Sequence, residues 1–183
     1  MKKRTFRTML LTVMLAAVCL SFTGCYSHTY ATKQEGTYVA DTFELSVPDG
    51  WMRNERYENQ VVFCTKDYPD DCASYISVGY TDEKQLDVLR KYQDSIKEQI
   101  ISGLEEKLGE DCKATVYTYE DSEMNGYDCV HIVTSYISEN LTYTQDQYTF
   151  DSSTGSVTFC YTRAGADDYA EAFEESINSI VIK

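Results

Sequence analysis

The chain has 183 residues, 30 of them acidic and 16 basic, and a formal net charge of −14. An acidic surface repels nucleic acid and anionic phospholipid headgroups, so we expect no nucleic-acid partner and no basic membrane-binding patch. Residues 37–183 are numerous enough to bury the core of one domain.

The first 24 residues have the pattern of a secretory signal peptide. A basic start precedes an apolar run from residue 9 to residue 22. The run is shorter than the roughly 20 apolar residues that a membrane span needs, so an uncleaved transmembrane helix is the less favoured alternative. All basic residues of this leader precede Cys25 and no Asp or Glu does, so its removal makes the remaining chain still more acidic. They are Lys2, Lys3, Arg4 and Arg7.

Phe22-Thr23-Gly24-Cys25 resembles the bacterial lipobox, with Phe22 where that motif usually has Leu. The resemblance implies that the Cys25 thiol is joined to diacylglycerol and becomes the new amino terminus. Two acyl chains hold a protein stably at a membrane, whereas one does so only marginally. We therefore expect a lipid-anchored protein on the extracytoplasmic face of the cell membrane. The alternative is ordinary cleavage after Gly24, with Cys25 free or in a disulfide.

Residues 25–36 are small, polar and aperiodic, which predicts a flexible tether before a single domain over 37–183. Alternating apolar residues then predict a strand over 42–47, which ends at the Pro48-Asp49-Gly50 turn. Further strands are predicted over 60–65 and 74–80.

Five cysteines remain beyond Cys25, and thiols outside the cytoplasm tend to pair. Cys64 and Cys72 flank a predicted turn that contains Pro69, so a hairpin there would bring the two sulfurs together. We slightly favour this disulfide over two free thiols. The other three cysteines allow one more disulfide and leave one thiol unpaired, and the sequence does not show which two would pair. They are Cys112, Cys129 and Cys160.

From Asp82 the apolar residues recur at spacings of three and four, which predicts one long amphipathic helix that ends before Gly109. Thr81 or Asp82 is the expected N-cap. Four strands should follow, over 114–120, 127–137, 141–150 and 156–163. Turns are expected at Asn125-Gly126, Glu139-Asn140 and Thr154-Gly155. A second helix is predicted over 167–180.

These elements give an α+β fold, an antiparallel β-sheet with a long central helix and a C-terminal helix packed against it. The stretches "DTFELSVPDGW" (41–51) and "FEESINSIVI" (173–182) resemble the opening and closing segments of the PsbP/DcrB-like families. The resemblance implies an α/β/α sandwich and a role as an accessory or binding module, with no catalytic residue to carry over. The matching positions are core and turn residues only. They are Phe43, Pro48, Trp51, Phe173 and Ile177.

An enzymatic alternative rests on Cys129 and His131, because residues two apart on a strand project from the same face. A thiol beside an imidazole can become a nucleophile, although the sequence shows no third group to orient His131. A zinc site is a weaker alternative, because its candidate ligands do not show the short spacings that preorganise a zinc-binding pair. They are Cys64, Cys72, Cys129 and His131. A calcium site at Asp67, Asp70 and Asp71 is also disfavoured, because these residues lack the alternating ligand spacing of a calcium-binding loop. We expect no metal site and no cofactor.

Tyrosine is abundant, with 16 residues. Several lie in the strand-rich half and would form a platform for a glycan or an extended peptide if they lined the solvent face of the sheet. The alternative is that they are structural. They are Tyr117, Tyr119, Tyr136, Tyr143, Tyr148 and Tyr161.

The favoured hypothesis is a non-enzymatic, membrane-anchored lipoprotein of the bacterial cell envelope that binds a protein or cell-wall partner. The alternatives are a thiol-dependent envelope enzyme that uses Cys129 and His131, and a glycan-binding module with a tyrosine-rich sheet face.

Overall fold

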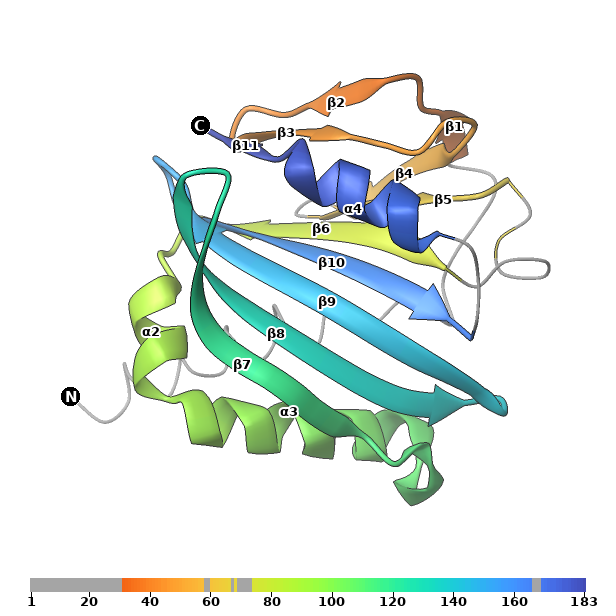
Figure 1. The fold of residues 1–183 in the computed structure, drawn as a ribbon, viewed down its shortest axis with the longest axis vertical. Coiled ribbons are helices and arrows are strands. Elements are labelled where there is room, and N and C mark those ends of the chain that lie inside the picture. Colours follow the sequence, from red (N-terminus) through yellow and green to blue (C-terminus); the bar gives the residue numbers. More distant parts are fainter. Residues whose placement is uncertain (1–30, 58–59, 67, 69–73, 166–168) are drawn as a thin grey trace.

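The computed structural model describes residues 31–57, 60–66, 68, 74–165 and 169–183. Its centre is an eight-stranded antiparallel sheet in the order β1-β4-β5-β6-β10-β9-β8-β7 (Figure 1). The strands are β1 (Ala31–Lys33), β4 (Met52–Tyr57), β5 (Gln60–Cys64), β6 (Tyr75–Thr81), β7 (Thr115–Met124), β8 (Tyr127–Ser138), β9 (Leu141–Asp151) and β10 (Ser156–Ala164). The predicted α+β class is confirmed.

A small sheet and the helices complete the fold. The small sheet has the order β11-β3-β2 and consists of β2 (Thr37–Val39), β3 (Phe43–Ser46) and β11 (Val181–Ile182). The helices are α2 (Leu86–Lys91), α3 (Gln93–Leu108), the short 3₁₀ helix η3 (Glu110–Cys112) and α4 (Ala170–Asn178). We call the side of the large sheet that faces α4 and the small sheet the front face, and the other side the back face.

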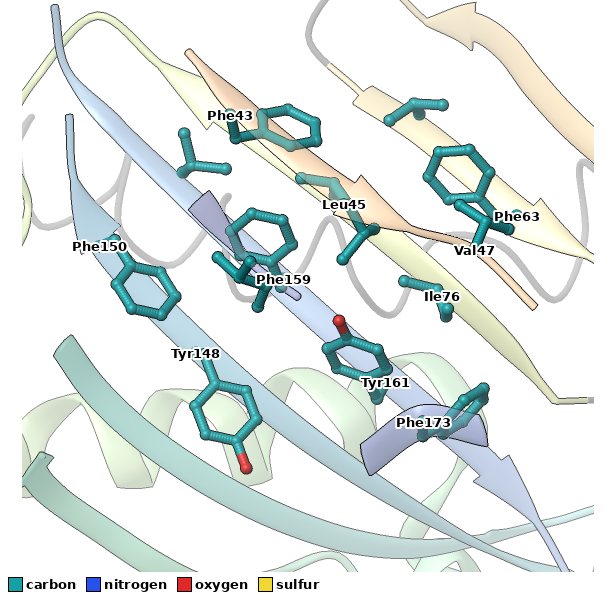
Figure 2. Packing of buried hydrophobic residues seen from close by; sticks show 14 of the residues in the cluster. Phe43, Leu45, Val47, Phe63, Ile76, Tyr148, Phe150, Phe159, Tyr161 and Phe173 are labelled. Atoms are coloured by element: carbon teal, nitrogen blue, oxygen red, sulfur yellow. The ribbon is translucent and has the colours of Figure 1, made fainter. Parts of the chain in front are cut away.

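The front core lies between the large sheet, the small sheet and α4. Strand β3 turns Phe43 and Leu45 inward, and Figure 2 shows them next to Phe159 of β10. The rings of Phe43 and Phe159 meet edge-on, with 5.2 Å between their centroids. Phe173 of α4 packs edge-on against Trp51, with 5.8 Å between the ring centroids. Three of the positions that match the PsbP/DcrB-like families are therefore core residues, as expected.

The back core joins α2 and α3 to β7, β8 and β9. Its helical members, Leu86, Leu89, Ile96, Ile100 and Leu104, follow the predicted apolar stripe. The helix is not continuous, however. It begins at Leu86 rather than near Asp82, and it breaks at Tyr92, where φ is −116° and ψ is 28°. It ends before Gly109 as predicted, with φ 89° at that glycine.

The β7–β8 and β8–β9 hairpins close at the predicted turns. Asn125 and Gly126 have φ of 54° and 82°, and Glu139 and Asn140 have φ of 51° and 65°. Two successive residues with positive φ define the type I′ turn, which suits the twist of an antiparallel hairpin. The helix predicted over 167–180 is shorter, α4, and strand β11 follows it.

The predicted tether is wrong for residues 31–36. Residues 31–33 form β1, which pairs with β4, and the Gln34 N–H donates to the Trp51 carbonyl at 2.9 Å. Strand β4 itself was not predicted, since "MRNERY" has no apolar alternation. Among the described residues, no helix is long and apolar enough to cross a membrane.

Candidate functional site

The proposed thiol–imidazole pair does not form a nucleophilic dyad. Cys129 and His131 lie on the same face of β8, but Cys129 is a fully buried member of the front core. Burial raises the pKa of its thiol to about 11, against a smaller lowering by a hydrogen bond with Ser122. A thiol in that environment stays protonated at neutral pH and is a poor nucleophile.

His131 instead lies between two carboxylates. Its Nδ1 is 3.5 Å from Glu120 Oε1 on β7, and its Nε2 is 3.5 Å from Asp146 Oδ1 on β9. The ring also lies flat on Tyr148, with 4.4 Å between the centroids and 4° between the planes. Each ring nitrogen therefore lies within 4 Å of a carboxylate oxygen, and no hydrogen bond joins His131 to Cys129.

Arg163 extends this group to a fourth strand. Its Nη2 lies 3.7 Å from Asp146 Oδ2. The side chains are partly exposed: His131 17%, Asp146 23%, Arg163 37% and Glu120 59%. Near the β7–β8 turn the front side is covered, since Cys129 is buried in the front core. We call the rest of the front side of β7, β8 and β9, from Glu120, His131 and Asp146 to the other end of these strands, together with Arg163 of β10, the open face, and Figure 1 shows none of the described helices on it.

Part of this cluster could have been read from the sequence. Glu120 and His131 are equally distant from the Asn125-Gly126 turn, so a two-residue turn there makes them cross-strand partners. His131 and Tyr148 are related in the same way by the Glu139-Asn140 turn. We missed the cluster because His131 was considered only with its neighbour in sequence.

Those of the proposed zinc ligands that the structure describes are not brought together. Cys64 ends β5, and β6, β10 and β9 separate it from Cys129 on β8, a span of roughly 19 Å at the usual strand spacing. The described residues contain no group of three or more His, Cys, Asp or Glu side chains that could hold a metal. Asp67, Asp70 and Asp71 lie outside the described residues.

Two other cysteine predictions also lie beyond the described chain. Cys25 and Cys72 are not among the described residues, so lipidation and the Cys64–Cys72 disulfide stay predictions. Cys112 and Cys129 are buried free thiols in the back and front cores, respectively. A bridge between these two would have to pass through the sheet.

The tyrosines do not line an exposed sheet face. All of those singled out in the sequence are buried except Tyr117, which is 70% exposed at a bulge in β7. Tyr119, Tyr136 and Tyr143 belong to the back core, and Tyr148 and Tyr161 to the front core. The tyrosine platform on the sheet is therefore wrong, and these residues are structural.

A groove of about 690 Å³ lies apart from the open face, at the end of the sheet where the β9–β10 hairpin turns. Residues 38–42, the end of β6 with Asp82, and the hairpin line it. Its lining residues are Tyr38, Ala40, Asp41, Thr42, Tyr80, Thr81, Asp82, Ser152, Ser153, Thr154 and Ser156.

No protein-family model and no curated protein sequence matches the chain. Solved structures do resemble it. Cyanobacterial PsbP (CyanoP) from Synechocystis sp. PCC 6803 aligns with a TM-score of 0.63 and 15% identity, over 88% of this chain and 99% of that protein. A protein from Bacteroides thetaiotaomicron VPI-5482 aligns with a TM-score of 0.54 and 15% identity, over 82% of this chain. The aligned part is 49% of the Bacteroides protein, so the chain spans about half of its length. The chain therefore has a PsbP-like fold.

Proposed function

We propose that the chain is a lipid-anchored accessory module of the bacterial cell envelope, which binds a protein partner through the open face and has no catalytic chemistry of its own. The signal-peptide pattern and Cys25 support the anchor. The single observation that carries the binding role is the half-buried charge cluster at the edge of the open face.

The cluster suits recognition of another protein. Arg163, Asp146, His131 and Glu120 present both signs of charge along one line across four strands. Charged groups in such a pattern fix the register of a partner and exclude surfaces of the wrong sign. The protonated Cys129 thiol agrees with a non-enzymatic role.

The anchor is tested by replacing Cys25. We expect the Cys25→Ser variant to move from the membrane to the soluble fraction, because it lacks the thiol that carries the lipid. Ser27→Ala is the matched control and should stay at the membrane. Intact-mass analysis of the mature protein should show Cys25 as an acylated amino terminus, and a mature terminus without fatty acid would refute the anchor.

The open face is tested by photocrosslinking in intact cells. A photoreactive phenylalanine in place of Thr118, which pairs with Val133 on the same sheet face as His131, should give one discrete cross-linked product, and the same residue in place of the exposed Ser102 on α3 should not. Arg163→Glu should abolish the product, because it reverses the cation of the cluster. Cross-links of equal yield from both positions, or a product that persists with Arg163→Glu, would contradict the assignment.

A further inference from the structure

The groove at the end of the sheet is a built feature with its own chemistry. It is formed by three segments that are distant in sequence: residues 38–42, the end of β6, and the β9–β10 hairpin. Its volume of about 690 Å³ falls within the range of small-molecule sites, about 300–1,000 Å³. None of its lining residues belongs to the charge cluster of the open face.

Hydrogen bonds tie the walls of the groove together. Lys183 connects two of them: its carbonyl accepts from the Ser153 N–H at 3.0 Å, and its own N–H donates to the Thr42 carbonyl at 3.0 Å. The Lys183 ammonium also donates to the Ala40 carbonyl at 2.9 Å. A site whose walls are held before binding loses less conformational entropy when a ligand enters.

The third wall is held by close packing. The Gly155 backbone lies so near the end of β6 that an added Cβ would be 1.8 Å from the Thr81 carbonyl oxygen. Within the hairpin, Ser152 Oγ accepts from the Gly155 N–H at 3.2 Å. The hairpin therefore has a fixed position relative to Thr81 and Asp82.

The lining selects a class of ligand. Asp41 and Asp82 are the charged residues that line the groove. The Lys183 ammonium beside its wall is paired with the Glu44 carboxylate at 3.1 Å, so the charge around the groove is negative overall and disfavours anionic ligands. Carboxylates accept hydrogen bonds from ligand hydroxyls, and the hydroxyls of Ser and Thr both donate to them and accept from them. Tyrosine adds a flat apolar ring with a polar tip, the combination that suits a sugar. Tyr80 is 36% exposed here, and packing against Phe43 and Phe63 fixes the ring of Tyr38.

We propose that this groove binds a short neutral glycan, with Tyr80 as the stacking platform and Asp41 and Asp82 as acceptors for sugar hydroxyls. The site lies outside the open face, so it does not depend on the protein-partner role proposed above. It adds a ligand of a second chemical class to the same domain.

Calorimetric titration of the full chain, purified in a detergent without a sugar headgroup, tests the proposal. The probes are chitotetraose, cellotetraose and maltotetraose, with an acidic hyaluronan tetrasaccharide as the charged comparison. We expect saturable binding of at least one neutral tetrasaccharide, and at least tenfold weaker binding of the acidic one. No binding of any neutral probe at millimolar concentration, or tighter binding of the acidic probe, would overturn the proposal.

Variants locate the site. Tyr80→Ala should weaken the binding at least tenfold, whereas Tyr117→Ala, which also removes an exposed tyrosine, should change it less than twofold. Thr154→Arg places a large cation on the exposed hairpin wall without altering the core, and it should block binding while the melting temperature is kept. Equal effects of Tyr80→Ala and Tyr117→Ala, or binding that survives Thr154→Arg, would refute this location. Failure here would leave the membrane-release and cross-linking results unaffected.

Discussion

At the scale of single residues, the environment of a side chain decides its chemistry more than its neighbours in sequence do. Cys129 and His131 are two residues apart on one strand, yet they take part in unrelated surroundings. The thiol is enclosed by the front core, whereas the imidazole lies between Glu120 and Asp146 over the ring of Tyr148. Strand geometry placed them on one face but could not show which groups each would contact.

The Cys129 thiol is expected to be inert in the folded protein. With its pKa raised to about 11, only about one thiol in a thousand is ionised at pH 8, and burial keeps reagents away from it. Iodoacetamide labelling, followed by mass spectrometry of the peptide that contains Cys129, should therefore be more than tenfold slower in the native protein than in denaturant. Rapid native labelling would restore the case for a reactive thiol.

At the scale of elements, the β9–β10 hairpin depends on a glycine for close approach rather than for a turn conformation. A side chain at position 155 would collide with the backbone at Thr81 and Asp82, and backbone cannot move aside as the end of a flexible side chain can. The base of the same hairpin also holds the start of α2, because the Asp151 carboxylate accepts the Gln85 N–H at 3.0 Å.

Gly155→Ala is therefore expected to lower the free energy of unfolding by about 1–3 kcal/mol or more, the usual cost of forcing atoms into a packed site. Gly103→Ala is the matched control, since an added Cβ in the middle of α3 meets no atom within 4 Å. Gly103→Ala should raise the free energy of unfolding by about 0.5–1 kcal/mol, because alanine has a higher helix propensity than glycine. Urea unfolding of both variants measures the difference, and a stable Gly155→Ala protein would contradict the close contact.

The elements that the sequence predicted well are those with local causes. Asn125-Gly126 closes a hairpin because both residues tolerate positive φ, and the apolar stripe from Leu86 to Leu104 fixes the buried side of the helices. The break at Tyr92 has a tertiary cause. There the Tyr119 hydroxyl of β7 donates to the Leu89 carbonyl at 3.0 Å, and the Gln93 amide donates to the Tyr119 carbonyl at 2.8 Å.

The charge cluster likewise has one contact with a local cause and others that depend on the tertiary structure. The pairing of Glu120 with His131 follows from a turn, so it was available from the sequence. The contacts of Asp146 with His131 and Arg163 join side chains that are not directly opposite in the register, and they depend on the twist of the sheet and on rotamers. Strand β4 was missed because its place between β1 and β5 comes from pairing, not from its own residues.

At the scale of the whole molecule, the layers on the two faces of the large sheet are offset. The small sheet and α4 pack in front of β5, β6 and β10, whereas α2 and α3 pack behind β7, β8 and β9 (Figure 1). The offset leaves the front of β7–β9 uncovered beyond Cys129 and Tyr148, toward the Glu139-Asn140 turn, and the charge cluster lies at the edge of that uncovered part. The described residues form three hydrophobic clusters, the front core, the back core and a small one of Val62, Cys64, Tyr68 and Tyr75, and each of them contains buried tyrosines.

These tyrosines should make the whole protein sensitive to alkaline pH. Burial raises the pKa of Tyr75, Tyr119, Tyr148 and Tyr161, in the case of Tyr148 to about 12, and that of Cys129 to about 11. In the unfolded chain these groups ionise near 10 for Tyr and 9 for Cys. Above pH 9 the unfolded state therefore binds fewer protons than the native state, so the free energy of unfolding must fall as pH rises.

Urea unfolding at pH 8, 9.5 and 11 should accordingly show a steady loss of stability, most of it between pH 9.5 and 11. Tyr148→Phe removes one of the groups that titrate late, and its stability should fall less over the same interval than that of the parent chain. Tyrosinate absorbance gives an independent reading, since the native protein should ionise fewer tyrosines at pH 11 than the unfolded protein does. A free energy of unfolding that stays constant up to pH 11 would mean that these side chains are hydrated in the folded state, and their placement in the hydrophobic clusters would then need revision.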